Sequence, residues 1–101
     1  MRISFERSGG FAGIIMSTTV DTANMTANEA SQVKQLVEVA DFFNLAAIIT
    51  SPQAQYDRFQ YRVTVEDNNK QNTVVVGESA IPGNLRPLID WLTAAAKKGN
   101  S

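Results

Sequence analysis

Residues 59–66 carry the pattern that most restricts the fold of this chain. Four apolar residues alternate there with four polar ones: Phe59, Tyr61, Val63 and Val65, and between them Gln60, Arg62, Thr64 and Glu66. A period of two, built from β-branched and aromatic residues, is typical of a strand with one buried and one exposed face. Such a strand needs paired neighbours and a layer that covers its apolar side. We therefore expect a sheet with a one-sided core.

Three further strands are predicted from the rest of the chain. Residues 2–7 alternate in the same way, Gly9 and Gly10 can form a tight turn, and residues 11–20 supply the return strand. Residues 67–71 are rich in types that tolerate left-handed backbone, and a strand containing Val74 and Val76 follows them. The chain therefore contains two predicted hairpins, one at its beginning and one after residue 58.

Two amphipathic helices are predicted. Thr26 and Glu29 have the spacing of a capping box, which begins a helix over residues 27–42. Pro82 can open the second helix and Gly99 can end it. An apolar stripe lies between them: Leu85, Leu88, Ile89 and Leu92, with Trp91 flanking it as a lid on the core. Residues 42–49 predict an irregular core-filling segment or a short strand, and residues 50–57 a polar loop.

These elements predict an α+β fold of order ββαββα, in one domain over residues 1–101. The two hairpins join in a four-stranded antiparallel sheet, and both helices pack on one face. The other face is then open to solvent. It carries Ser4, Glu6, Ile15, Ser17, Thr19, Gln60, Arg62, Thr64, Glu66, Thr73 and Val75.

The composition argues against most kinds of catalytic or metal site. The chain has no histidine and no cysteine, which excludes serine–histidine or cysteine–histidine catalysis and the usual zinc ligands. Its carboxylates do not form an evident acid–base pair, since Glu66 and Asp67 are strand neighbours and Asp41 and Asp90 fall on exposed helix faces. We therefore expect a non-enzymatic protein without a cofactor or bound metal.

Charge and hydropathy bear on partners and location. The net charge of -1 argues against a nucleic-acid binder, which needs a basic surface. The charged segment Met1–Arg7 does not fit a signal peptide, and no apolar run is long enough to cross a bilayer. These features predict a soluble cytoplasmic protein that binds no membrane, and we expect it to be a monomer.

Two segments each allow two interpretations. Residues 7–11 are either a plain tight hairpin, with Phe11 plugging the sheet edge, or a rigid loop that presents Arg7 and Ser8 beside an aromatic anchor. The polar side of residues 59–66 is either ordinary solvated surface or one edge of a binding surface. Composition alone does not separate these alternatives.

Four collinear blocks resemble the emfourin family, the protein inhibitors of protealysin and related thermolysin-like metallopeptidases. They are residues 5–13 (FERSGGFAG), residues 36–43 (LVEVADFF), residues 57–66 (DRFQYRVTVE) and residues 85–92 (LRPLIDWL). The first and third blocks are the most specific together. The chain departs from the family pattern at Ala46, where a proline is expected, and at Asn72, where a histidine is expected.

The resemblance implies a protein inhibitor that blocks the cleft of a thermolysin-like (M4) zinc metallopeptidase, its protein partner. Without histidine or cysteine, the chain can offer at most an oxygen donor such as Glu6 to the enzyme's zinc. We expect occlusion by two neighbouring loops. The predicted partner-binding residues are Glu6, Arg7, Ser8, Gly9, Gly10, Phe11, Tyr56, Asp57, Arg58 and Gln60. The alternatives are a general protein-binding module that uses the open sheet face, an enzyme that uses carboxylates alone, and a structural subunit.

Overall fold

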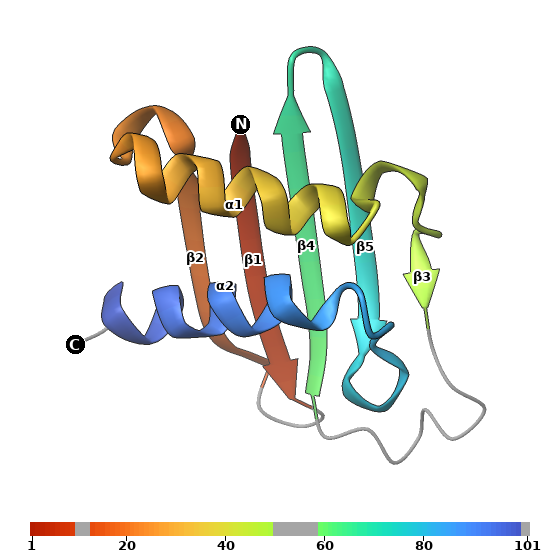
Figure 1. The fold of residues 1–101 in the computed structure, drawn as a ribbon. Coiled ribbons are helices and arrows are strands. Elements are labelled where there is room, and N and C mark those ends of the chain that lie inside the picture. Colours follow the sequence, from red (N-terminus) through yellow and green to blue (C-terminus); the bar gives the residue numbers. More distant parts are fainter. Residues whose placement is uncertain (10–12, 50–58, 100–101) are drawn as a thin grey trace.

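The computed structural model describes residues 1–9, 13–49 and 59–99. Within them the chain forms β1 (Arg2–Gly9), β2 (Gly13–Asp21), α1 (Ala27–Val39), β3 (Ile48–Ile49), β4 (Phe59–Asp67), β5 (Lys70–Gly77) and α2 (Arg86–Gly99). Both helices cross the same face of the sheet and run in opposite directions (Figure 1). This confirms the α+β class and the two predicted hairpins, with the helices in one layer.

The sheet has five strands among the described residues, in the order β2-β1-β4-β5-β3, so the prediction of a four-stranded antiparallel sheet was wrong. β1 pairs with β2 and β4, and β4 pairs with β5, all antiparallel. The additional strand, β3, runs parallel to β5, where Ile48 lies opposite Val75 and Ile49 opposite Val76. A two-residue strand is too short to show a period of two, so the sequence left it open as irregular or strand.

α1 begins as predicted but ends three residues earlier, at Val39. The Thr26 hydroxyl accepts a hydrogen bond from the Glu29 amide at 3.2 Å and caps the first turn. At the other end Asp41 adopts a left-handed conformation with φ of 51°, which an α-helix cannot continue through. The Asn44 side-chain amide donates to the Asp41 carboxylate at 2.8 Å and holds this reversal, after which Phe42–Asn44 form a short 3₁₀ helix, η2.

α2 begins at Arg86 rather than near Pro82, which corrects the predicted start. The Pro82 carbonyl accepts hydrogen bonds from the amides of Leu85 and Arg86, at 3.0 and 3.1 Å. These bonds form a turn that leads into the helix. Gly99 is the last residue of α2, as the sequence predicted. Proline therefore initiates the turn before the helix and is not its first residue.

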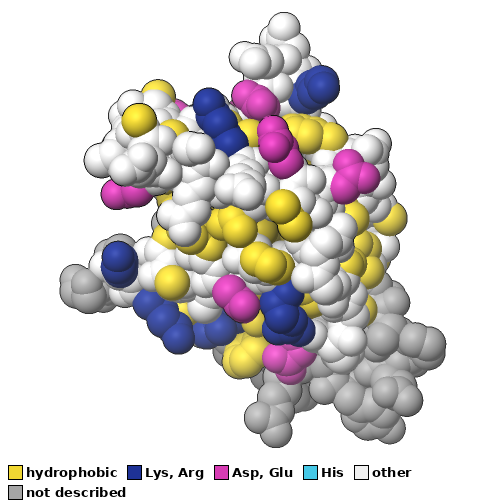
Figure 2. Space-filling model, viewed as in Figure 1, with side chains coloured by type: hydrophobic (Ala, Val, Ile, Leu, Met, Phe, Trp, Pro, Cys, Tyr) yellow, Lys and Arg dark blue, Asp and Glu magenta, His cyan; other side chains and the backbone are white. Residues whose placement is uncertain are grey.

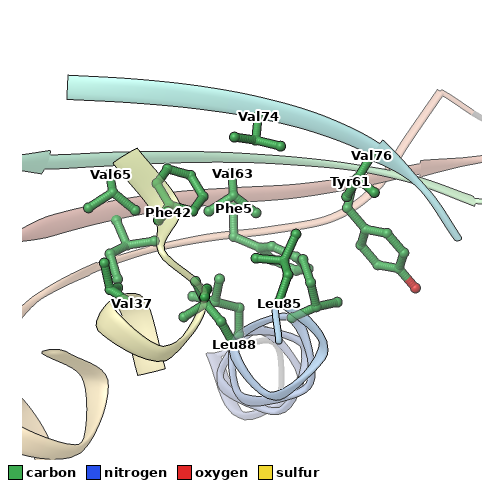
Figure 3. Close-up of a cluster of buried hydrophobic side chains, with 14 of the residues drawn as sticks. Phe5, Val37, Phe42, Tyr61, Val63, Val65, Val74, Val76, Leu85 and Leu88 are labelled. Carbon is green, nitrogen blue, oxygen red and sulfur yellow. The ribbon is translucent and has the colours of Figure 1, made fainter. Parts of the chain in front are cut away.

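One hydrophobic cluster fills the space between the sheet and the helices (Figure 3). Its fully buried members include residues of three strands, both helices, η2 and the turn before α2: Ile3, Phe5, Val33, Phe42, Val63, Val65, Val74, Val76, Leu85, Leu88 and Leu92. The Phe5 and Tyr61 rings stack with centroids 6.0 Å apart. Trp91 is partly buried and packs against the cluster, as expected for a lid. Tyr61 lies at the margin, with its hydroxyl directed away from the other labelled side chains.

The helix side of the molecule carries both signs of charge. Figure 2 shows apolar side chains between the two helices, with acidic and basic side chains over both of them. The opposite face of the sheet has no helix over it in Figure 1. Thr64 and Thr73 lie opposite each other on that face, with their hydroxyl oxygens 2.9 Å apart. Side chains on the open face and at the ends of the strands are therefore not covered by either helix.

Candidate functional site

Three strands meet at one end of the sheet, and several predicted site residues lie there. Gly9 of β1 lies opposite Gly13 of β2 on one side and opposite Phe59 of β4 on the other. Ser8 lies opposite Gln60 in the next position along the β1–β4 pair. We call this region the glycine end of the sheet and define it as residues 7–9, 13, 59 and 60. It brings together the first and third sequence blocks, which are fifty residues apart in the chain.

Arg7, Ser8 and Gly9 belong to β1, so their assignment to a hairpin loop was wrong. The predicted strand stopped at residue 7 because glycine weakens a strand pattern and a charged residue stood where the alternation requires an apolar one. In the structure all three residues pair with β4: Arg7 with Tyr61, Ser8 with Gln60 and Gly9 with Phe59. Their backbone is therefore fixed by the sheet.

β2 is irregular where it enters the sheet. The register between β1 and β2 shifts between Arg7 and Ser8: Arg7 lies opposite Met16, and Ser8 lies opposite Ile14. One additional β2 residue at this step makes a β-bulge, so the unbroken alternation predicted for residues 11–20 does not hold. Gly13 has φ of 67°, a conformation that side chains of L-residues rarely adopt. The bulge and the positive φ of Gly13 together determine the register in which the first residues of β2 pair with β1.

A shallow depression of about 250 Å³ lies on the open face next to the glycine end. It is lined by Glu6, Ser8, Gln60, Tyr61, Arg62 and Val75. Glu6 and Arg62 are directly opposite each other on β1 and β4, an arrangement of unlike charges that favours this strand pairing. The depression thus unites three predicted site residues, Glu6, Ser8 and Gln60, and offers hydrogen-bond donors and acceptors around an apolar patch.

Arg7 lies on the other face, with the core. It is half-buried, and its guanidinium carbon lies 4.5 Å from the centroid of the Phe59 ring. Its Nε atom is buried and has no hydrogen-bond partner among the residues that the structure describes. An unsatisfied buried donor of this kind costs about 1–3 kcal/mol, while a cation–π contact contributes about 0.5–2 kcal/mol. The structure therefore separates Arg7 from Glu6, Ser8 and Gln60, with which the sequence had grouped it.

The remaining predicted contact residues, Gly10, Phe11, Tyr56, Asp57 and Arg58, lie outside the described residues. Sequence analysis did not single out Arg62 and Val75 as site residues, although both were placed on the open face. Their part in the depression depends on the register of β1, β4 and β5, which sets Arg62 opposite both Glu6 and Val75. A period of two indicates the face on which a side chain lies, but it does not indicate the cross-strand neighbours.

Within residues 1–9, 13–49 and 59–99, no three acidic side chains gather as a metal site would require. Asp41 and Asp90, considered as possible acids or bases, are both exposed and lie on separate elements. None of the helices in the described part of the chain is long and apolar enough to cross a membrane. Near the glycine end, polar side chains of β1 and β4 line the depression on the open face of the sheet.

Comparison with known proteins gives one match. The family model Emfourin matches residues 5–93, which spans nearly all of the described sheet and both helices. No curated protein matches the chain, and no solved structure matches it. The match begins in β1 and ends within α2, so it includes the glycine-end residues of β1, β2 and β4 as well as α1 and the first part of α2, which cover the core. The chain therefore belongs to the emfourin family.

Proposed function

We propose that this protein inhibits a thermolysin-like zinc metallopeptidase by binding the enzyme and occluding its substrate cleft. One observation carries the proposal: the two most specific blocks of the resemblance lie next to each other at the glycine end, where Gly9 is opposite Phe59. Packing alone does not require the glycine-rich block of residues 5–13 and the block of residues 57–66 to converge at one end of the sheet. Binding residues are disproportionately found on loops that a rigid scaffold holds in place.

The chemistry of the surface supports binding without catalysis. Glu6, Ser8, Gln60 and Arg62 provide acceptors and donors around the depression, and the chain has no imidazole or thiol to ligate the enzyme's zinc. Inhibition therefore depends on shape and hydrogen bonding, with a carboxylate or carbonyl oxygen as the closest possible approach to the metal. We also propose that the protein acts as a monomer and that it works in the cytoplasm.

The proposal is tested by titrating the purified chain against a thermolysin-like peptidase with a fluorogenic peptide substrate. Two variants address the site, Phe11→Ala and Gln60→Ala. The matched control is Glu66→Ala, an exposed residue on the same face of β4 at the opposite end of the strand. We expect the site variants to raise the inhibition constant about ten-fold or more, as for residues at the centre of an interface, and the control to leave it unchanged.

The outcomes separate the alternatives. If the unmodified chain does not inhibit the peptidase, the proposed function is wrong and a general binding module on the open face is favoured. If the chain inhibits but Phe11→Ala and Gln60→Ala bind as well as the unmodified protein, the function stands and the site assignment is wrong. Thermal unfolding of each variant checks that loss of inhibition is not loss of folding.

A further inference from the structure

Arg7 occupies a position where the strand pattern calls for an apolar residue. Ile3 and Phe5, four and two residues earlier on β1, are fully buried on the helix side of the sheet. Arg7 continues this face, opposite Met16 of β2 and Tyr61 of β4. A methionine or leucine would satisfy the packing at this position without burying a polar atom. The charge of Arg7 therefore needs a different explanation.

The contact that Arg7 makes is specific in its geometry. Phe59 is the diagonal neighbour of Arg7 across the β1–β4 pair, since Arg7 lies opposite Tyr61, and long side chains can meet at such diagonals. The guanidinium carbon lies 4.5 Å from the ring centroid, well within the range of a cation–π contact. The Nε atom gains no hydrogen bond in this arrangement. The stack therefore joins β1 to β4 at the point where both strands reach the glycine end.

We propose that Arg7 is a positioning residue, which fixes Phe59 and through it the register and spacing of Ser8 and Gln60, rather than a residue that contacts the peptidase. The inference rests on the proposed function for its consequence in inhibition. Gln60 follows Phe59 directly on β4 and lies opposite Ser8. Phe59 is the first residue of β4, so the contact between its ring and the Arg7 guanidinium also restrains the β4 backbone there. This restraint places the next side chain, that of Gln60, in the depression.

The two faces of the sheet favour positioning over direct contact. Glu6, Ser8 and Gln60 line the depression on the open face, whereas Arg7 lies on the helix face with its Nε buried. Recognition of a carboxylate by arginine uses Nε together with a terminal nitrogen in the usual bidentate fork. An arginine whose Nε is enclosed beside an aromatic ring is poorly placed for that fork. Its influence on a partner therefore passes through Phe59.

A double-mutant cycle tests the inference. The variants are Arg7→Met, Phe59→Leu and the pair together, with Phe59→Tyr as the conservative replacement that keeps the ring face. Arg2→Met, an exposed arginine at the other end of β1, is the control. We expect each single loss to raise the inhibition constant about two- to thirty-fold, the range for losing a cation–π contact. The double variant should be no weaker than the weaker single variant, and Phe59→Tyr and Arg2→Met should inhibit like the unmodified chain.

A readout that needs no enzyme separates this inference from the proposed function. We expect faster amide hydrogen exchange at Ser8 and Gln60 in both single variants, with no further change in the pair. The positioning role would be overturned if the double variant raised the inhibition constant by the product of the two single effects. Unchanged exchange at the Ser8 and Gln60 amides in Arg7→Met would overturn it as well. If Arg7→Met does not fold, Arg7→Lys replaces it. Inhibition retained by Arg7→Lys supports positioning by the cation. If Arg7→Lys weakens inhibition by the same factor with Phe59 in place as in the Phe59→Leu background, the positioning role is contradicted.

Discussion

Asn72 of β5 donates its side-chain amide to the carbonyl oxygen of Phe42, 2.9 Å away and thirty residues earlier in the chain. The same nitrogen lies 3.4 Å from the carbonyl oxygen of Leu45. Both carbonyls belong to the segment between α1 and β3, and the Phe42 carbonyl also accepts a hydrogen bond from the Leu45 amide at 3.2 Å. Asn72 thus ties the irregular η2 segment to the sheet, at the position where the family pattern led us to expect histidine.

Asn72→Ala should lower the free energy of unfolding by about 1–3 kcal/mol, because it removes two hydrogen bonds in a partly buried site and leaves the Phe42 carbonyl with the Leu45 amide as its donor. For a chain of this size the melting temperature falls by about 4–8 °C for each kcal/mol. The measurement is thermal unfolding followed by circular dichroism. Gln71→Ala, at an exposed neighbour on β5, is the control. Equal melting temperatures for the two variants would show that the Asn72 bonds contribute nothing net.

Phe42→Ala should destabilise the protein by about 3–5 kcal/mol, as expected when a large buried side chain leaves a cavity. Phe42 is only 1% exposed although it belongs to a three-residue 3₁₀ helix. Val39→Ala serves as the comparison, because Val39 is close in sequence but 52% exposed, and its change should stay within about 0.5 kcal/mol. Urea unfolding measures both. A small effect at Phe42 would mean that η2 is not part of the core.

Replacing Asn69 tests the turn between β4 and β5. Asn68 and Asn69 have φ of 47° and 69°, and they form the two-residue connection between Asp67 and Lys70, which pair directly. Asn69→Ala should cost about 1 kcal/mol, since alanine is disfavoured in the left-handed region, whereas Asn69→Gly should be neutral or stabilising. Chemical denaturation of the two variants provides the comparison. The prediction fails if alanine and glycine at this position give the same stability.

Inhibition of a thermolysin-like peptidase should not be relieved by added zinc. A chain without histidine or cysteine has no ligand set that competes well for the metal, so the enzyme should keep its zinc while inhibited. Activity is measured at saturating inhibitor with and without excess zinc, and the zinc content of the isolated complex is measured directly. Recovery of activity in proportion to the added zinc, or a complex depleted of zinc, would contradict occlusion.

Much of the fold could be predicted because the relevant signals are local. The alternation in residues 59–66, the cap formed by Thr26, and the paired asparagines before β5 each determine backbone geometry over a few residues. The places where prediction went wrong are those with short or conflicting signals. β3 has only two residues, and α1 ends at Val39, just before Asp41, a residue whose left-handed conformation no hydrophobic pattern indicates.

The candidate site was predicted in part for the same reason. The sequence could mark Glu6, Ser8 and Gln60 as polar residues near the ends of predicted strands, but it could not show that they share one depression with Arg62. It grouped Arg7 with them because the four lie in two distinctive blocks. The structure assigns Arg7 to the opposite face, where it contacts Phe59. Only the pairing of β1 with β4 shows which side chains reach the depression and which side chain contacts Phe59.

The sequence by itself determined the class of this protein: an α+β fold with two hairpins and two helices around a one-sided core, without the side chains that acid–base or zinc chemistry most often uses. The tertiary structure decided which residues meet. Register, the bulge in β2 and the parallel addition of β3 depend on contacts between segments far apart in the chain. Such contacts are selected by the packing of the whole core, since a slip of one residue would turn every apolar side chain of a strand to solvent.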